Sequence, residues 1–591
     1  MPHSFIAPPL VHADGCDPEL NILVKTWGLA RRAMPRWPGL LLAAAVLGSS
    51  LSGNAQTAPA TLPSGAEPGR EAPRPLVPQS KRAMPQIEVP QSPAAVAPPG
   101  SGQARFVLND VVIEGASAYS AEVLRGLYAK LLGQEVSVAQ VFEVANAIEL
   151  RYRQDGFVTS RVLVPEQTVA DGRFRIRVLE GHVAGVVFQG EAGPAGAALE
   201  SLMAGLTALR PINLAEIERR LLLANDLPGL QVQGSLEASP TAQGGSTLVV
   251  RTQRRERDLS VALDNRATPY MGGRQISAQA SWFGLGPRAD RLGLSLRSSL
   301  PTGRSTSVGV NYDAMVSPSG STLGLNLSNS RSQPGLELAA LDIQSQVNSL
   351  VGTWAQPLKR SREENLRSVV QLEWRDVRTD LGSTPFTHDR LQIARLGLSY
   401  DRADAYDGIT TARGMLHQGL SGQAAGSAEG ARPTRANGRS DFTKLTLDLS
   451  RLQQLGARTH AWASLTAQYS QRPLLASEEL ALGGAHYGRA FDDGEISGDK
   501  GAALMVELRH HPESLPSNAQ VFGFADAGRI WAAPGGSVPA RPKLASAGAG
   551  VRLSLPRGML ATLEVAKPLH TEVRTQANRN ARAFFSLSAP F

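Results

Sequence analysis

The sequence predicts two tandem α+β modules followed by a transmembrane antiparallel β-barrel of about 16 strands. The modules are predicted by a repeat, because the order β-α-α-β-β occurs at residues 105–181 and again at residues 182–255. The barrel is predicted by the pattern of residues 256–591, where short runs alternate between apolar and polar residues. Such alternation is typical of strands with one apolar face.

Residues 1–55 have the pattern of a cleaved export signal. Its three parts are the basic residues Arg31, Arg32 and Arg36, the apolar run 40–47 and the small residues 53–55. This order is that of a secretory signal peptide, and the apolar run is too short to span a bilayer. Met34 is an alternative start, in which case the residues before it form an extension that a signal does not need.

Residues 56–104 are rich in proline and alanine and have no apolar periodicity. Such a segment buries too little apolar surface to fold, so we expect an extended, mostly disordered linker. The single cysteine, Cys16, precedes the expected cleavage site. The mature protein would therefore have no disulfide bond and no thiolate chemistry.

The first module, residues 105–181, begins with a predicted strand at 106–115 and a short helix at 120–133. A second helix follows, because apolar residues recur at a spacing of three to four and so share one helical face. These residues are Val138, Val141, Ala145, Ile148 and Tyr152. The runs "VTSRVLVP" and "RFRIRVLEG" alternate and predict the two closing strands.

The second module, residues 182–255, repeats this order. A strand at 182–190 precedes two helices, of which the second has Asn213 as its expected N-cap and ends before Gly229. The runs "LQVQGSLEAS" and "STLVVRTQ" predict two strands. Each module therefore has the elements to form a small core of its own.

The C-terminal region, residues 256–591, contains many short alternating runs and no convincing helix. Apolar sets on one strand face include Leu292, Leu294 and Leu296; Leu323, Leu325 and Leu327; and Leu445, Leu447 and Leu449. Roughly twenty residues per strand and connection give about 16 strands. The chain ends in "RAFFSLSAPF", apolar at every second position up to Phe591, which predicts a lipid-facing strand that closes the barrel. A soluble sandwich also shows alternation, but the export signal, the small polar residues and this last strand favour a membrane barrel.

A glycine-rich stretch, "LGGAHYGRAFDDGEISGDKGAALMVELRH", interrupts the strand pattern at residues 482–510. Its candidate functional residues are Gly483, Gly484, Gly488, Arg489, Ala490 and Phe491. The glycines permit a reversal of the chain, after which Leu504, Val506 and Leu508 resume the alternation of a strand. One arginine at the centre of such a loop is a candidate for a specific contact.

This order of segments resembles the outer-membrane transporters of two-partner secretion systems, the hemolysin and filamentous-hemagglutinin secretion and activation proteins, a branch of the Omp85 superfamily. The modules look like the POTRA domains of that family. The family carries Val-Arg-Gly-Tyr/Phe at the tip of a hairpin loop that folds into the barrel, after a Glu and a Gly-Gly pair. Here "SEELALGGAHYGRAF" is similar, with Glu478 or Glu479 as the acid. A second family motif, Phe-x-Asp-x-Gly on a later strand, is matched by Phe524, Asp526 and Gly528.

The resemblance implies an inward loop around 482–502 and a bidentate pair between the Arg489 guanidinium and the Asp526 carboxylate, which would pin the loop to the barrel wall. An ordinary solvated arginine in the lumen is the alternative. Gly488 replaces the Val of the motif and Ala490 replaces its Gly, and Ala490 would resist a positive φ. Alternation alone does not place Asp526 in the lumen, because it shares a strand face with two phenylalanines.

The resemblance further implies an outer-membrane pore of a Gram-negative bacterium, whose periplasmic POTRA modules bind a large hemolysin- or hemagglutinin-like partner exoprotein for secretion. An Omp85-type factor that inserts other outer-membrane proteins is the alternative, although such factors usually have more modules. A passive porin would have no use for the modules. Phe591 is expected to be a C-terminal signal for the barrel-assembly machinery. Related transporters have an N-terminal plug helix, but the proline-rich segment shows no amphipathic period. The sequence therefore does not decide whether this protein has a plug.

No catalytic or metal site is expected. His510 and His511 are adjacent, so on a strand they point to opposite faces, and no Ser/His/Asp arrangement has a nucleophile-elbow context. The "GLG" at 284–286 lacks the strand-turn-helix context of a nucleotide site. The net charge of +8 is spread along the chain without a basic tract, which argues against nucleic acid. We therefore expect no enzyme, no cofactor and no metal.

Overall fold

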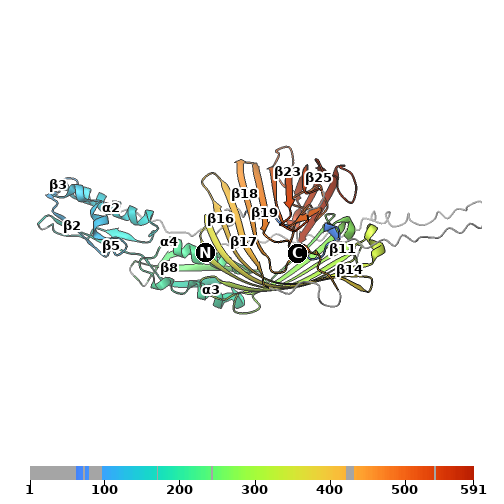
Figure 1. Ribbon diagram of the computed structural model, residues 1–591. Coiled ribbons are helices and arrows are strands. Elements are labelled where there is room, and N and C mark those ends of the chain that lie inside the picture. Colours follow the sequence, from blue (N-terminus) through green and yellow to red (C-terminus); the bar gives the residue numbers. More distant parts are fainter. Residues whose placement is uncertain are drawn as a thin grey trace, which may run out of the picture. The chain divides into compact units, whose positions relative to one another are not determined.

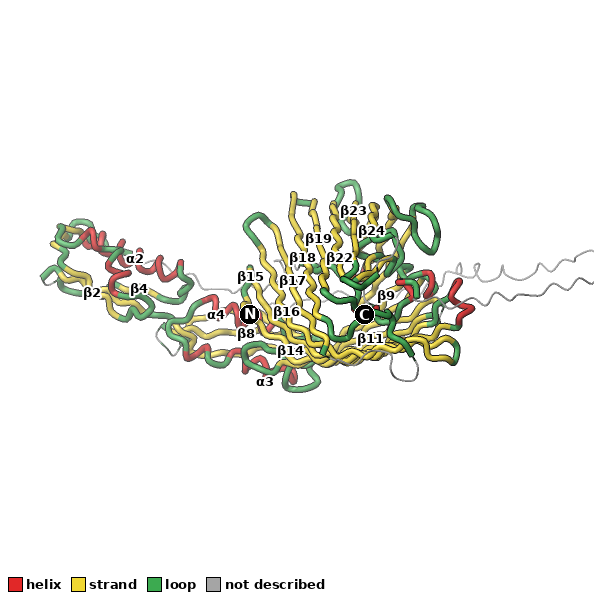
Figure 2. Tube along the Cα trace, viewed as in Figure 1, coloured by secondary structure: helices red, strands yellow, loops and turns green. Residues whose placement is uncertain are grey.

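The computed structural model describes residues 62–70, 73–78, 96–169, 171–240, 242, 244–301, 303–420, 431–537 and 541–591. The expected signal peptide lies outside the described residues. Among these residues the four α-helices belong to the two modules, whereas the region after residue 256 consists of strands, loops and short 3₁₀ turns (Figures 1 and 2). No described helix is long and apolar enough to cross a membrane.

The first module is a three-stranded sheet, in the order β2-β5-β4, with two helices and a small β1–β3 pair. Its elements are β1 Arg105–Val107, β2 Asp110–Glu114, α1 Ala121–Arg125, β3 Glu135–Ser137, α2 Val138–Gln154, β4 Arg161–Leu163 and β5 Arg173–Leu179. The predicted face of α2 is confirmed, because Val141, Ala145, Ile148 and Tyr152 are buried in the core of this module. The predicted helix at 120–133 is shorter, ending at Arg125 before Gly126, a residue that weakens helices.

A carboxylate at the end of β5 fixes the loop between β2 and α1. Glu180 accepts hydrogen bonds from the Tyr152 hydroxyl at 2.8 Å and from the backbone N–H groups of Ser117 at 2.6 Å and Ala118 at 2.8 Å. Burial by itself would raise the pKa of Glu180, but the hydrogen bonds from Ser117, Tyr152 and Ala118 outweigh it and hold the pKa below its usual value. The ionised carboxylate is therefore part of the folded module.

The second module repeats the arrangement, with a sheet in the order β6-β8-β7. Its elements are β6 His182–Gly190, α3 Gly196–Met203, α4 Leu214–Asn225, β7 Leu230–Ala238 and β8 Gly245–Arg254. The predicted N-cap is confirmed, because the Asn213 side chain accepts a hydrogen bond from the Ala215 N–H at 2.9 Å. The exposed edges of this sheet are β6 and β7, since β8 lies between them.

The C-terminal region is a closed antiparallel barrel, in which the described strands number 16 and β26 pairs with β9. The strands are β9 Arg257–Asp264, β10 Arg274–Phe283, β11 Arg291–Leu300, β12 Ser305–Met315, β13 Thr322–Ser332, β14 Ile343–Arg360, β15 Glu364–Leu381, β16 Thr384–Ala403, β17 Gly408–Gly419, β18 Thr443–Gly456, β19 Thr459–Ser470, β22 Lys500–His510, β23 Ala519–Trp531, β24 Lys543–Ser554, β25 Leu560–Pro568 and β26 Arg582–Pro590. The predicted fold class is confirmed.

The alternation of each strand separates an apolar outer face from a polar lumen. Leu323, Leu325 and Leu327 of β13 are about half exposed, as the residues of a lipid-facing surface should be. On β22 the exposed Leu504 alternates with Glu507, which is fully buried on the lumen side. Side chains that face the lumen can therefore meet across the barrel and contact anything that enters it.

Candidate functional site: the inward loop and its anchor

The loop between β19 and β22 forms a hairpin of its own inside the barrel. Its two strands, β20 Leu480–Leu482 and β21 Ile496–Gly498, pair with each other and not with the barrel ladder. Gly483 has a φ of +120°, and a Cβ there would lie 2.1 Å from the carbonyl oxygen of Asp492, so the turn requires glycine. The reversal predicted from the glycines is therefore present.

Arg489 lies at the tip of this loop and is 4% exposed. Its Nη1 lies 2.6 Å from Oε2 of Glu507 on β22 and 3.5 Å from Oε2 of Glu564 on β25. The guanidinium carbon lies 4.3 Å from the ring centroid of Phe524, the distance of a cation–π contact. The arginine is thus neutralised by the barrel wall rather than solvated.

Asp526 contacts the backbone of the loop and not the Arg489 guanidinium, so the predicted side-chain pair between Arg489 and Asp526 is wrong. Its carboxylate accepts the backbone N–H groups of Gly488 at 2.9 Å and Arg489 at 3.2 Å, and the Ser546 hydroxyl at 2.6 Å. An aspartate side chain is short, and here it receives the backbone of the tip, whereas the longer Glu507 reaches the guanidinium. Asp526 therefore caps the tip and Arg489 pairs elsewhere.

The other two residues of the barrel-wall motif also face the loop. Phe524 and Asp526 are buried on the lumen side of β23, so the face shared with the phenylalanines is the lumen face. Gly528 lies under the loop, because a Cβ at this position would come within 2.6 Å of Leu482 Cδ1. The three motif residues thus supply a cation–π surface, a backbone acceptor and room for the close approach of β20.

The carbonyl groups of the tip are held by arginines of the wall. Arg266 Nη1 donates to the Arg489 carbonyl oxygen at 2.7 Å, and Arg582 Nη1 donates to the Ala490 carbonyl oxygen at 2.9 Å. Arg582 also pairs with Asp492 at 2.7 Å. The tip is consequently held from both sides, through its N–H groups by a carboxylate and through its carbonyl groups by guanidinium groups.

Sequence reasoning missed the two glutamates and these arginines. Glu507 stands between the outward residues Val506 and Leu508, and Glu564 stands between Leu563 and Val565. A charged residue flanked by two lipid-facing residues must point into the lumen, and this signal was available. What the sequence did not show is that the two strands bring both acids to the same arginine.

Ala490 does not have the positive φ that its place in the motif suggested, since it is absent from the described non-glycine residues with positive φ. Gly488 instead has a φ of +84°, at the position where the resembled motif has valine. Ala490 is fully buried, and its N–H donates to the Ser546 hydroxyl at 3.3 Å. The left-handed position of the tip is therefore occupied by a glycine, Gly488, and Ala490 needs no strained backbone.

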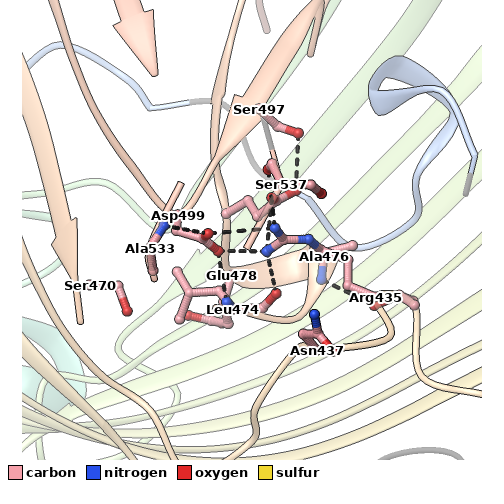
Figure 3. A network of polar contacts seen from close by, with 12 residues as sticks. Arg435, Asn437, Ser470, Leu474, Ala476, Glu478, Ser497, Asp499, Ala533 and Ser537 are labelled. Carbon is pink, nitrogen blue, oxygen red and sulfur yellow. Dashed lines mark hydrogen bonds and ion pairs between the residues drawn. The ribbon is translucent and has the colours of Figure 1, made fainter. Parts of the chain in front are cut away.

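A second set of polar contacts holds the base of the loop (Figure 3). Asp499 is fully buried, and its carboxylate lies 2.5 Å from Arg435 Nη1. The same carboxylate accepts the N–H groups of Leu474 at 2.8 Å and Ala533 at 2.9 Å. This one side chain therefore joins the start of the loop to the connections before β18 and after β23.

The acids before the glycine pair belong to the same base. Glu478 pairs with Lys444 at 2.7 Å and with Arg375 at 3.0 Å, both from the barrel wall. Glu479 pairs with Arg435 at 3.1 Å and with Arg70 at 2.7 Å. Both candidate acids are therefore engaged, one with the wall and one with a segment that precedes the modules.

That preceding segment was expected to be disordered, but residues 62–70 contact the lumen side of the barrel. Leu62 and Ala66 are buried against Tyr270 and Ile343, and Arg70 donates to the Ala476 carbonyl oxygen at 2.9 Å. The short blue turn in Figure 1 shows this segment among the barrel strands. Composition alone could not show the order, because the partners lie more than 200 residues away.

Phe591 lies apart from the other candidate residues. It is 76% exposed, and its N–H donates to the Leu259 carbonyl oxygen on β9 at 2.7 Å. The last residue therefore extends the pairing of β26 with the first barrel strand. Its expected role in assembly stays a prediction.

A closed barrel with an anchored inward loop, preceded by two α+β modules, defines a POTRA-containing outer-membrane transporter. Residues 244–553, more than half of the chain, match the family "Haemolysin secretion/activation protein ShlB/FhaC/HecB", and residues 106–181 match "POTRA domain, ShlB-type". The chain belongs to the haemolysin secretion/activation protein family, as the resemblance implied. It is an outer-membrane transporter of two-partner secretion, with its POTRA modules in the periplasm.

Known proteins of similar sequence and structure agree with this assignment. The heme/hemopexin transporter protein HuxB of Haemophilus influenzae is 22% identical over 462 residues, which are 75% of this chain and 80% of that protein. The outer membrane transporter CdiB of Escherichia coli is 25% identical over 423 residues, 70% of each chain. The solved structure of CdiB from Escherichia coli superposes with a TM-score of 0.69 at 20% identity, covering 85% of this chain and 94% of that one. That structure supports the fold.

Proposed function

We propose that this transporter secretes one large partner exoprotein, of hemolysin or hemagglutinin type, from the periplasm to the cell surface. The inward loop carries this proposal. Its hairpin pairs with itself, so it can leave the lumen without breaking the barrel ladder. Its tip is held by ion pairs and hydrogen bonds, which water can replace when the loop moves, although Leu482, Tyr487 and Phe491 of the loop also pack in an apolar cluster with the wall. Folding of the partner outside the cell would then drive transit.

The second POTRA module offers an edge for an extended segment of the partner. Strand β6 pairs with β8 on one side only, and its Val187 and Phe188 are 46% and 39% exposed. An unpaired edge with exposed apolar residues favours the addition of a further strand from an unfolded chain. We infer that the partner binds there before it enters the pore.

Residues 62–70 are the resting plug in this proposal. They lie against the lumen wall, and the ion pair between Arg70 and Glu479 joins them directly to the inward loop. Because this ion pair joins the segment to the loop, movement of the loop would weaken the attachment of the segment. Within residues 62–70 the proposed plug is an extended proline-rich segment with one 3₁₀ turn.

The test is secretion of the exoprotein encoded beside this chain, with both genes expressed in one cell. Val187→Lys should abolish the appearance of the exoprotein outside the cell, because an edge lysine opposes strand addition. The matched control is Val112→Lys on β2, an edge strand of the first module with a residue that is 38% exposed. Loss of secretion in the control alone would indicate that the partner binds to the edge of the first module instead.

Deletion of residues 105–181 separates secretion from barrel assembly. A dedicated transporter should lose secretion while the other outer-membrane proteins keep their amounts. A broad loss of other barrels on deletion would instead support an Omp85-type assembly factor. Unchanged secretion in the deletion and in both edge variants would contradict a role of the modules in binding the partner.

A further inference from the structure

The outer face of the barrel has a depression of about 490 Å³ on the strands β22 to β24. Small side chains line it, namely Ala502 of β22, Ala527 of β23 and Ala545 of β24. Ala527 lies opposite Leu504 in one ladder and opposite Ala545 in the next. Leu504 is 48% exposed on the outer face, so the alanines that neighbour it face the lipid. They form a groove of methyl groups beside larger apolar side chains.

Basic side chains stand beside this groove. Arg529 and Lys543 lie opposite each other in the ladder between β23 and β24, and both line the depression. Lys567 of β25 lies opposite Ala547, four residues after Lys543 on the same face of β24, and so stands on the other side of Ala545. All three are exposed, and none forms a salt bridge with a carboxylate in the part of the chain that the structure describes. Three cations around one groove that form no ion pair create a site for an anion.

The outer face of β15 and β16 shows the contrasting arrangement. Arg378 lies 3.2 Å from Asp380, and Arg390 lies 3.3 Å from Asp376. These residues share strand parity with the exposed Trp374 and Leu396, so they also face outward. Basic residues on that part of the surface therefore form ion pairs, whereas Arg529, Lys543 and Lys567 form none in the described chain.

The groove and its cations lie at the level of the outer leaflet. The modules are periplasmic and precede β9, so β9 runs outward and the connections after β19, β23 and β25 are extracellular. Trp531 and Tyr469 are 43% and 53% exposed at this end, and such aromatic side chains mark the membrane interface. The Arg529 guanidinium carbon lies 5.4 Å from the Trp531 ring centroid, which places the charge at headgroup depth.

We propose that this surface binds a phosphorylated glycolipid of the outer leaflet. Its residues, named the outer-leaflet notch, are Ala502, Ala527, Arg529, Lys543, Ala545 and Lys567. The phosphate groups contact the three cations, and one acyl chain lies in the alanine groove. Arg529 and Ala527 are two residues apart on one strand, about 7 Å, so one lipid can reach both. Three cations favour a lipid with two phosphate groups over a phospholipid with one.

Native mass spectrometry of the purified full chain, titrated with bis-phosphorylated, hexa-acylated lipid A, tests this proposal. The unmodified protein should form a one-to-one complex. The triple variant Arg529→Gln, Lys543→Gln and Lys567→Gln should bind at least 100-fold more weakly, because each hydrogen bond to a charged group contributes about tenfold or more. Ala527→Leu fills the groove and should weaken binding about tenfold without changing the charge, by removing the contacts of several methylene groups.

Two controls make the result specific. The double variant Arg378→Gln and Arg390→Gln removes outward charges of the same kind on β15 and β16 and should bind as the unmodified protein does. Phosphatidylglycerol and dephosphorylated lipid A should bind at least tenfold more weakly than bis-phosphorylated lipid A. The heat-dependent shift in electrophoretic mobility confirms that each barrel is folded. Equal binding by the triple variant, or phosphatidylglycerol binding as tightly as lipid A, would overturn the proposal.

Discussion

Replacement of Arg489 by alanine should detach the tip of the inward loop from the barrel wall. The side chain is buried, pairs with Glu507 at 2.6 Å and forms a cation–π contact with the Phe524 ring. Removing one member of a buried ion pair usually costs about 3–5 kcal/mol, because it leaves a buried charge without a partner. Here Glu507 keeps Arg509 at 2.7 Å and Arg552 at 2.9 Å, so the lower end of that range applies.

A loss of about 3 kcal/mol corresponds to a shift of roughly 100-fold in the equilibrium between attached and detached tips. The Asp526 cap on the tip's N–H groups remains in this variant. Detachment therefore becomes more frequent without removing the loop from the barrel at rest. Secretion should fall as well if an ordered loop is needed for the working cycle, while the amount of barrel in the outer membrane stays the same.

Cysteine labelling measures the detachment directly, because the expected mature chain has no cysteine of its own. Ala503 is 2% exposed beneath the loop and packs with Leu482 in one apolar cluster. Ala503→Cys should react with a maleimide slowly in the parent and up to 100-fold faster with Arg489→Ala, because labelling then follows the detached fraction.

The matched control for this experiment is Arg509→Ala. It removes another cation from the same glutamate, but Arg509 belongs to β22 and not to the loop. Its effect on labelling should be threefold or less. If Arg489→Ala accelerates labelling no more than Arg509→Ala does, and secretion is unchanged, the anchoring role of Arg489 is refuted.

Three further predictions concern the cap, the plug and the first module. Asp526→Ala removes the acceptor of two backbone N–H groups, and each hydrogen bond to a charged group contributes about 1.5–3 kcal/mol. This variant should therefore accelerate the labelling of Ala503→Cys at least as much as Arg489→Ala does. A labelling rate equal to that of the parent would contradict the capping role of Asp526. Arg70→Gln breaks the ion pair with Glu479 and should raise the open-channel fraction in planar-bilayer recordings, whereas Arg74→Gln, a basic residue with no salt bridge in the described chain, should not. Glu180 has a lowered pKa in the folded first module, so its contribution to stability is present above the unfolded pKa of about 4.3 and is lost as the pH falls through the lower folded pKa. In urea unfolding of residues 105–181, the difference in unfolding free energy between the parent and Glu180→Gln should therefore shrink below about pH 4. A constant difference down to pH 2 would contradict this prediction.

The fold could be predicted from the sequence wherever one short period decides the structure. Alternation placed the lipid-facing leucines of β11, β13 and β18 and the last strand, because a barrel strand in lipid admits one apolar face. The helical period of α2 and the Asn213 cap were equally local signals. The boundaries of the elements were predicted less well. The expected strand at 106–115 is divided into β1 and β2, because β1 pairs with β3 rather than continuing into β2.

The site could be predicted only in part, because its contacts join strands that are distant in sequence. The loop-tip and barrel-wall residues were both identified and do meet in the lumen. The partner of the Arg489 guanidinium was assigned to the wrong acid, since a motif gives the residues but not their side-chain reach. Glu564 lies 75 residues from Arg489 and has no motif of its own. The order of residues 62–70 likewise depends on a surface that exists only in the closed barrel.

The loop is held in two chemically different ways, by polar contacts at its tip and by the apolar packing of Leu482, Tyr487 and Phe491 against the wall. The apolar contacts lose about 25 cal/mol for each Å² of apolar area that opening exposes to water. Ion pairs and capped N–H groups lose much less, because both partners are solvated again when water fills the lumen. The arginines that remain on the wall, Arg266 and Arg582, can receive the carbonyl groups of the tip again when it returns. The polar contacts of the tip are therefore the part of the attachment that can break and re-form at low cost, as the proposed passage of a protein through this lumen requires.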